Sequence, residues 1–344
     1  MRIAILSPVW FPVPPTGYGG IEWVVSLLAD GLTEAGHDVT LFASGDSRSL
    51  ATISSLYPDA PSAQIGQTSV ELSHALSCLA RAGDFDVVND HSGPLAAALG
   101  GLVSTPVVHT VHGPLSEAEL RTYRAIAEIA PRVGLISLSE NQRRPGPDLP
   151  WVANIHNALD LDSYPLHEER GEYLLFLGRM SPDKGAHRAI EVARAAGVPI
   201  KLAGKKREHA EQAYFDEVVR PLLGDDAEYV GETTHALKVD LLQNARATLF
   251  PIDWEEPFGL VMIESMACGT PVVATRRGAV PEVVAHGRSG VIVDDWHDMA
   301  AALPDADALE PDACRSWVEE HFSAERMTRD YAAAYEQVLA GVAA

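Results

Sequence analysis

The chain has 344 residues, with 26 lysines and arginines against 48 aspartates and glutamates, which gives a formal charge of −22 at pH 7. A hydrophobic content of 47% and a charged content of 22% are typical of a globular protein, and the length predicts two domains. The acidity argues against a nucleic-acid-binding surface and a polybasic membrane patch, and three scattered cysteines argue against a disulfide framework.

The N-terminal stretch MRIAILSPVWF is apolar but short. It has no small-residue cleavage site before Pro12 and Pro14, so it predicts a first β-strand and not a signal peptide. The chain has no run of about 18 apolar residues, which predicts that no helix spans a membrane. We therefore expect a cytoplasmic protein without integral membrane contact, and the oligomeric state is not predicted.

Short apolar runs alternate with helical patterns through the first half of the chain. Such repeated βα units predict a parallel sheet with helices on both faces. The expected strands are 3–6, 39–42, 87–88, 107–108 and 134–137, and the expected helices are 20–35, 70–82 and 117–130.

A turn rich in glycine and proline follows the first strand, from Pro12 to Glu22. A loop of this kind that opens a helix lets backbone N–H groups approach a phosphate. Its glycines do not have the spacing of a dinucleotide fingerprint, so a nicotinamide cofactor is not expected. The neighbouring aromatic residues Trp10 and Tyr18 would either stack on a sugar or pack in the core.

His109 and His112 follow a later strand of the first half. No third ligand lies at a motif spacing, so the pair does not predict a metal site. Three Asp-x-Asp pairs, at 84–86, 160–162 and 305–307, occur before a strand or in polar loops. We interpret them as surface acids and expect no metal.

The same alternation restarts in the second half, after the polar and turn-rich segment 160–171. We place the domain boundary at residue 165. The expected strands are 173–177, 200–203, 247–250, 272–274 and 291–293, and the expected helices are 185–196, 208–222, 236–244, 259–267 and 324–340.

Basic residues follow the first two strands of the second half. Arg179 offers a fork of donors and Lys184 a point charge, and together they suit a diphosphate. Lys205 and Lys206 follow the next strand and are expected to be solvated.

The segment 256–274, EPFGLVMIESMACGTPVVA, carries the most specific pattern in the chain. Its two carboxylates, Glu256 and Glu264, lie eight positions apart. A Pro-Phe-Gly turn predicts a helix that begins between them and contains Glu264. The N-terminus of a helix presents free N–H groups and partial positive charge, which suit a phosphate.

This segment resembles the E-x7-E signature of the family 4 retaining glycosyltransferases, and the flanking F-G-L and G-T-P-V-V-A residues match as well. The resemblance runs from Ile3 to about residue 285. It implies the GT-B fold, an α/β architecture of two Rossmann-like, doubly wound parallel-sheet domains that face a central cleft. The N-terminal acceptor domain would comprise 1–165, with the C-terminal helix 324–344 packed back on it, and the donor domain would comprise 166–323.

The resemblance implies roles for residues of the second half. Glu264 would bind the ribose hydroxyls of a nucleotide sugar, and Glu256 the hydroxyls of its sugar. Arg179 and Lys184 match the family's G-R…K-G element and would stabilise the departing diphosphate. Further donor contacts are expected from Phe258, Gly259 and Leu260, and from Gly231 near the base.

In the first half, Gly19 and Gly20 match a double glycine that covers the donor phosphates. His112 would line the donor-sugar pocket, which makes it, with Glu256, Arg179 and Lys184, a candidate catalytic residue; the alternative is an ordinary hydrogen-bonded histidine. Candidate acceptor-binding residues are Trp10, Tyr18 and Asn141. The family's N-G-[VL]-D element appears with Ala158 in place of glycine, which leaves the shape of that loop open.

The implied function is transfer of a hexose or pentose, with retention, from a nucleotide diphosphate sugar to a hydroxyl of a small-molecule or oligosaccharide acceptor. UDP is the expected nucleotide, and no resident cofactor is expected. Overall resemblance to family members that build antibiotics implies an acceptor from secondary metabolism. The alternatives are a sugar-nucleotide 2-epimerase of the same fold and a non-catalytic protein that binds a sugar nucleotide.

Overall fold

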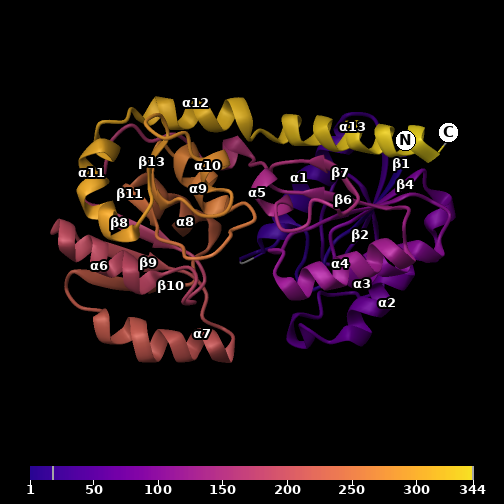
Figure 1. The fold of residues 1–344 in the computed structure, drawn as a ribbon, viewed down its shortest axis with the longest axis horizontal. Helices are drawn as coiled ribbons and strands as arrows, with labels where there is room; N and C mark the ends of the chain where they lie inside the picture. The colour runs from indigo at the N-terminus through magenta and orange to yellow at the C-terminus, as the bar shows by residue number, and fades with distance from the viewer. Residues whose placement is uncertain (18, 343–344) are drawn as a thin grey trace. The chain divides into compact units, whose positions relative to one another are not determined.

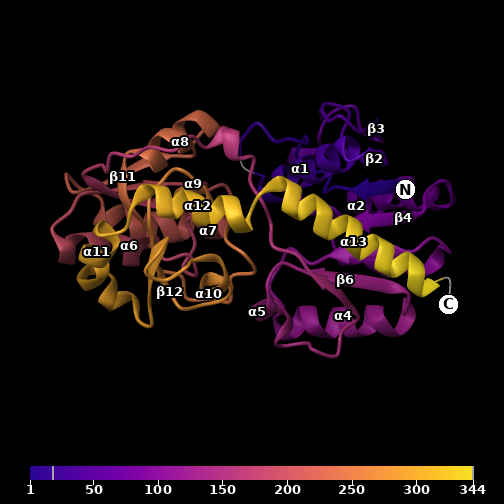
Figure 2. The same ribbon diagram turned by 90° about the horizontal axis from the view of Figure 1, so that it is seen from above.

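The computed structural model describes residues 1–17 and 19–342, which divide into two compact units. The first unit comprises Met1–Ala158 and the C-terminal helix that begins at Ala324, and the second comprises Leu159–Ser323. The division therefore follows Ala158, a little earlier in the chain than the predicted boundary at residue 165. Each unit is built around one sheet (Figures 1 and 2).

The first unit contains a seven-stranded sheet in which every neighbouring pair is parallel. Its strand order is β3-β2-β1-β4-β5-β6-β7, so the chain starts in the middle of the sheet and winds to both edges. The strands are β1 (Arg2–Leu6), β2 (Asp38–Phe42), β3 (Thr52–Ser54), β4 (Val87–Asp90), β5 (Val107–Thr110), β6 (Val133–Ser137) and β7 (Trp151–Asn154).

Helices cover this sheet, and the C-terminal helix packs on the helix that follows β1. The helices are α1 (Gly20–Glu34), α2 (Thr68–Leu79), α3 (Pro94–Leu99), α4 (Glu117–Ile129), α5 (Glu140–Arg143) and α13 (Ala324–Val342). Arg326 of α13 donates hydrogen bonds to the carbonyls of His156 (2.6 Å) and Asn157 (3.1 Å). These bonds join the C-terminal helix to the end of the N-terminal segment of the same unit.

The second unit contains a six-stranded sheet, also parallel, in the order β10-β9-β8-β11-β12-β13. Its strands are β8 (Tyr173–Leu177), β9 (Ile200–Ala203), β10 (Ala227–Gly231), β11 (Ala245–Phe250), β12 (Val272–Thr275) and β13 (Gly290–Val293). Its helices are α6 (Ala186–Ala196), α7 (His209–Tyr214), α8 (His235–Gln243), α9 (Leu260–Ala267), α10 (Val280–Val283), α11 (Met299–Asp307) and α12 (Pro311–His321).

Both sheets form the centres of hydrophobic cores because their strands are apolar on both faces. Leu174, Phe176 and Leu249 are at most 2% exposed and pack with apolar residues of α6 and α11. Ala4, Leu6 and Val88 are fully buried at the centre of the first sheet. Stable sheets of this kind hold the loops at the carboxyl ends of their strands, where ligands of open α/β sheets bind.

Three strands are not predicted by the sequence pattern: β3, β7 and β10. Each is short or only partly buried, so its sequence lacks the continuous apolar run of the central strands. The expected helix 208–222 is also interrupted, because α7 ends at Tyr214 and is followed by a π-helical turn and a short 3-10 turn that contains Pro221. Among the described residues, no helix combines the length and the apolar character that crossing a bilayer requires.

Ala158 does not need the left-handed conformation that a glycine in its place would allow. None of the non-glycine residues described has a positive φ, and Ala158 is only 1% exposed. The loop therefore turns with ordinary backbone angles and is held by Arg326 of α13 through the two carbonyls that precede Ala158.

Candidate active site

The helix α9 begins where the sequence predicts, directly after a glycine turn. Gly259 has a φ of +85°, and a Cβ atom there would lie 2.7 Å from Met262 and 3.2 Å from Phe250. Only glycine fits both the angle and the space. Leu260 is the first residue of α9, and Phe258 before the turn is 2% exposed and packs edge-on against Phe322. The first turn of α9 is therefore fixed on the core.

Glu256 is held at its backbone by a second close approach. Gly278 has a φ of +54°, and a Cβ atom there would overlap the backbone nitrogen of Glu256. The amide of Ala279 donates to the carbonyl of Glu256 at 2.9 Å. The carboxylate of Glu256 forms an ion pair with Lys184, and Glu256 is only 8% exposed.

Lys184 lies against aromatic rings as well as against Glu256. Its ammonium is 4.8 Å from the centre of the Trp254 ring and 5.7 Å from that of Phe250, and its side chain is 14% exposed. Ring faces stabilise a cation, so the rings of Trp254 and Phe250 add to the stabilisation of the Lys184 ammonium by Glu256. The structure thus brings together two of the predicted site residues, Lys184 and Glu256.

Glu264 lies inside α9 and is 6% exposed. Its Oε1 accepts hydrogen bonds from Lys238 of α8 (2.5 Å) and from the hydroxyl of Tyr164 (2.7 Å). Burial and the neighbouring carboxylate raise the pKa of Tyr164, so its hydroxyl stays protonated and donates. Both donors use Oε1, and no hydrogen bond to Oε2 occurs within residues 1–17 and 19–342.

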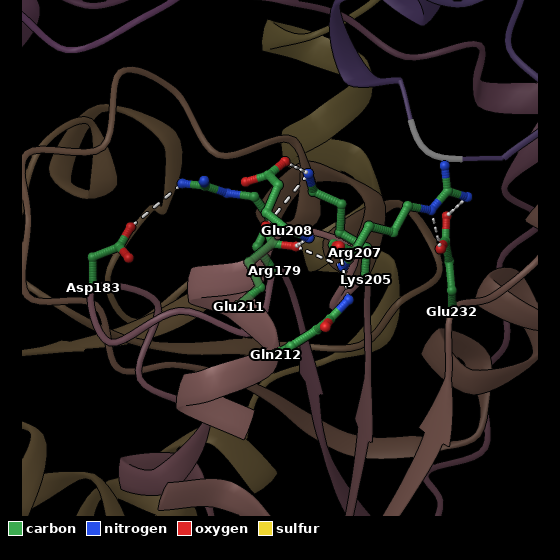
Figure 3. A network of polar contacts seen from close by, with 8 residues as sticks. All are labelled: Arg179, Asp183, Lys205, Arg207, Glu208, Glu211, Gln212 and Glu232. Carbon is green, nitrogen blue, oxygen red and sulfur yellow. Dashed lines mark hydrogen bonds and ion pairs between the residues drawn. The ribbon is translucent and has the colours of Figure 1, made fainter. Parts of the chain in front are cut away.

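Arg179 follows β8 and faces the loop after β9, where polar side chains form a network (Figure 3). The guanidinium of Arg179 is 3.5 Å from a carboxylate oxygen of Asp183, and both side chains are 32% exposed. This is a weak pair, so the guanidinium keeps most of its hydrogen-bonding capacity.

The loop after β9 differs from the prediction. Lys205, expected to be solvated, is 9% exposed, and its ammonium lies 2.6 Å from Glu208 and 3.4 Å from Glu211. The hydrogen bond from Lys205 holds the pKa of Glu208 below its ordinary value. Lys206 is also not free in solvent, because its ammonium lies 3.6 Å from the centre of the Phe215 ring. Sequence reasoning missed both partners because Glu211 and Phe215 belong to the next helical segment.

Gly231 ends β10 with a φ of +93° and accepts a hydrogen bond from the amide of Gly204 at 2.9 Å. The hydroxyl of Tyr229 donates to the carbonyl of Gly204 at 2.7 Å. Gly231 therefore lies at the carboxyl edge of the second sheet, beside the loop that carries Lys205.

In the first unit, Gly19 and Gly20 lie at the N-terminus of α1, as predicted. Glu22 in the first turn of this helix is 4% exposed, and one of its oxygens lies 2.9 Å from the position of a Cβ on Gly19. Burial raises the pKa of Glu22 to about 7. Its place after the glycines is the one sequence signal that could have marked this buried acid. Tyr18 lies outside the described residues.

The aromatic and amide candidates for acceptor binding have different surroundings. Trp10 is 9% exposed, packs with Val9 and Val70, and donates to Glu71 at 3.3 Å, so it is mainly a core residue. Asn141 lies in α5, directly after β6, and is half-buried.

His112 follows β5 and is part of a chain of polar residues. Its Nε2 lies 2.9 Å from Nδ1 of His91, which in turn contacts Asn89 of β4. Burial lowers the pKa of His112 to about 3 and that of His91 well below its ordinary value. His109 belongs to a separate group, with Asp90 at 2.6 Å and the hydroxyl of Tyr123 at 2.9 Å.

Within the part of the chain that the structure describes, no three His, Cys, Asp or Glu side chains come together in a way that could hold a metal ion. The candidate residues of the second unit are carboxylates and cations placed beside the N-terminus of α9. In the second unit these can hold hydroxyl groups and a polyanion, which are the parts of a nucleotide diphosphate sugar.

Comparison with known proteins shows the family to which the chain belongs. Residues 18–161 match the model of the Glycosyltransferase Family 4, and residues 162–319 match that of the Glycosyl transferases group 1. The phosphatidyl-myo-inositol mannosyltransferase of Mycolicibacterium smegmatis is 30% identical over 366 aligned residues, which cover 92% of this chain and 86% of that protein. The D-inositol 3-phosphate glycosyltransferase of Pseudarthrobacter chlorophenolicus is 26% identical over 387 aligned residues, covering 92% and 90%.

Among solved structures, the chain is similar to AviGT4, a glycosyltransferase involved in avilamycin A biosynthesis. The two share 28% identity and superimpose with a TM-score of 0.72 over 99% of each chain. The expected α/β fold of two parallel-sheet domains is confirmed. The chain belongs to the family 4 glycosyltransferases and has the GT-B fold.

Proposed function

We propose that this glycosyltransferase transfers a hexose or pentose from a UDP-sugar to a hydroxyl of a small-molecule or oligosaccharide acceptor, with retention of configuration and without a metal or resident cofactor. The acceptor is proposed to be an intermediate of antibiotic or other secondary metabolism. Similarity to AviGT4 over nearly the whole chain supports this pathway.

The observation that carries the proposal is the pair of buried carboxylates around the N-terminus of α9. Glu264 has Oε1 occupied by Lys238 and Tyr164 and is proposed to receive the ribose hydroxyls on Oε2. Glu256 is proposed to accept from hydroxyls of the donor sugar. The free N–H groups of α9 would supply a place for phosphate between the two acids.

The proposed chemistry needs no protein nucleophile. The bond from the anomeric carbon to the diphosphate oxygen breaks, and the acceptor oxygen bonds to the same face of that carbon. The acceptor proton passes to an oxygen of the departing diphosphate. Arg179, Lys184 and the backbone near Leu260 would stabilise the negative charge that develops on the diphosphate.

His112 of the first unit is proposed to contact the donor sugar, and Gly19 and Gly20 the donor phosphates. Gly231 is proposed to border the base. A covalent intermediate on Glu256 is the less favoured version of the mechanism, because its carboxylate already pairs with Lys184.

The donor site is tested by thermal unfolding of the wild type and of Glu264→Ala with UDP-, GDP-, ADP- and dTDP-sugars, each with and without a chelator. We expect UDP-sugars to raise the Tm of the wild type with or without chelator, and not that of Glu264→Ala. The matched control is Asp226→Ala. It removes a carboxylate that pairs with Arg194 at 2.7 Å. Asp226 lies just before β10, at the amino ends of the strands and not at the carboxyl ends where ligands bind, so this variant should respond as the wild type does.

The proposal fails if no nucleotide sugar shifts the Tm, or if Glu264→Ala responds like the control. Product analysis then separates the enzymes that share the fold. A 2-epimerase would convert the donor sugar with no acceptor present, and a protein that only binds would release no UDP with any acceptor.

A second candidate acceptor is an inositol derivative. Two of the relatives are named for inositol-containing acceptors, and one of them is 30% identical to this chain. Incubation with a radiolabelled donor and either myo-inositol 3-phosphate, phosphatidyl-inositol vesicles or an oligosaccharide acceptor distinguishes these possibilities by which product carries the label.

A further inference from the structure

A continuous chain of hydrogen bonds in the first unit leads from α13 through β4 to His112. The hydroxyl of Tyr335 in α13 lies 2.7 Å from Oδ1 of Asn89, and Nε2 of His91 lies 2.7 Å from the same oxygen. Nδ1 of His91 then lies 2.9 Å from Nε2 of His112. Tyr335, Asn89 and His91 are at most 2% exposed, so water does not replace these contacts.

The orientation of Asn89 is fixed by its other contacts. Its Nδ2 lies 3.0 Å from the carbonyl of Val108 and 3.3 Å from the hydroxyl of Thr110. A backbone carbonyl only accepts, so the amide nitrogen must face Val108 and the amide oxygen must face the histidine. Oδ1 cannot donate, and both of its neighbours therefore donate to it.

The orientation of the Asn89 amide determines which ring nitrogen carries the proton, first in His91 and then in His112. His91 must carry its proton on Nε2 in order to donate to Asn89. A neutral imidazole has one N–H, so Nδ1 of His91 is an acceptor, and Nε2 of His112 must donate to it. Both rings stay neutral because burial lowers the pKa of each.

We propose that Asn89 and His91 are positioning residues that fix His112 in its Nε2–H tautomer, so that His112 presents Nδ1 to a ligand solely as a hydrogen-bond acceptor. Tyr335 completes the arrangement because its hydroxyl donates the second hydrogen bond to Oδ1 of Asn89 and so connects α13 to this series of hydrogen bonds. No partner of His112 Nδ1 occurs among the residues described, and His112 itself is half-buried. This nitrogen is therefore available.

The consequence for substrate choice rests on the proposed function. If His112 contacts the donor sugar, the contacting group must be a hydroxyl that donates. A carboxylate or a fluorine at the same position can only accept, and it would face the lone pair of Nδ1. The transferred sugar is therefore expected to carry a hydroxyl at the position that meets His112, and a uronic acid carboxylate there is disfavoured.

The tautomers are measured directly by long-range ¹H–¹⁵N correlation on the full chain labelled with ¹⁵N-histidine, at pH 7 without nucleotide. The signals of the two rings are assigned from their loss in His112→Gln and His91→Gln. We expect both rings as the Nε2–H tautomer. A His112 ring that is charged, or protonated on Nδ1, overturns the proposal whether or not the protein is a glycosyltransferase.

The role of Asn89 is tested by Asn89→Leu, which keeps a similar volume but removes the acceptor. We expect the single tautomer of His91 and His112 to give way to a mixture, and an unchanged spectrum overturns the assignment to Asn89. The control is Tyr123→Phe, which removes a buried hydroxyl from the separate His109 group and should leave the His112 signals unchanged. If Asn89→Leu does not fold, the wild-type tautomer still decides the proposal.

The consequence for the sugar is tested with UDP-sugars in which one hydroxyl at a time is replaced by fluorine. One position should weaken binding roughly 2- to 10-fold in the wild type, the effect of one hydrogen bond, and have no such effect in His112→Ala. Equal tolerance at every position overturns the consequence. If the unmodified nucleotide sugars do not bind, the proposed function fails while the measured tautomer stands.

Discussion

The hydroxyl of Tyr164 is predicted to stabilise the second unit through its hydrogen bond to Glu264. The donor and acceptor are 5% and 6% exposed, and their oxygens lie 2.7 Å apart. Tyr164→Phe removes this bond and retains the ring contacts with Lys238 and His235. A hydrogen bond to a charged group contributes about 2 kcal/mol. In a unit of this size that corresponds to a fall in Tm of about 4 to 8 °C.

A comparison variant has a neutral acceptor in place of the carboxylate. Tyr173 in the same unit donates to a neutral acceptor, the carbonyl of Leu241, at 2.8 Å. Tyr173→Phe should therefore cost only about 1 kcal/mol. The two variants are compared by thermal unfolding, and Tyr164→Phe is also combined with Glu264→Gln in a double-mutant cycle.

The cycle should show a coupling of about 1 kcal/mol, because the neutral amide that Glu264→Gln introduces is a weaker acceptor for the Tyr164 hydroxyl than the carboxylate is. Two results would refute the reasoning: a Tm for Tyr164→Phe equal to that of Tyr173→Phe, or a coupling energy near zero. Either would mean that Glu264 does not act as a charged acceptor for Tyr164.

Three further predictions concern the other buried groups. Because burial raises the pKa of Glu22 from 4.5 to about 7, the unfolded state loses this proton at a lower pH than the folded state does, and the free energy of unfolding falls as the pH rises through this range. Between pH 4.5 and 8 the free energy of unfolding of the wild type, measured with a chemical denaturant, should fall by about 3 kcal/mol more than that of Glu22→Gln. Gly278→Ala should lower the Tm and the donor affinity, because the added Cβ would overlap the backbone of Glu256. Gly287 also has a positive φ, +79°, but open space around it, so Gly287→Ala should lower the free energy of unfolding by only about 1 kcal/mol. Lys184→Met should destabilise by about 3 kcal/mol because it leaves Glu256 buried and unpaired, and adding Glu256→Gln should restore most of the loss; no recovery in the double variant would contradict this.

The central strands and the helix α9 are predictable because local sequence determines them. Runs such as Leu174–Leu177 are apolar without interruption, which is typical of strands buried on both faces. The start of α9 follows from Gly259, whose angle and lack of space no other residue satisfies. The half-buried edge strands β7 and β10 carry no such pattern, and they form because a neighbouring strand is there to pair with.

The partners of the site residues are not predictable in the same way. Lys238 and Tyr164 lie 26 and 100 positions from Glu264, and nothing in their own surroundings marks them as its donors. The same is true of Asn89, whose contacts with His91 and Tyr335 depend on how β4 and α13 pack. Sequence patterns therefore name candidate groups for the chemistry, while the fold determines which other side chains contact those groups.

Lys184 illustrates how these two kinds of information combine. Its position after β8 suggests a diphosphate ligand, but in the structure its ammonium pairs with Glu256. These roles do not compete, because an ammonium has three N–H donors and the pair with Glu256 uses one of them. The rings of Trp254 and Phe250 hold the side chain in place, so its remaining donors are oriented without the cost of ordering a free lysine. A lysine that is already positioned by one anion can bind a second, and this is how we interpret the ion pair of Lys184 with Glu256.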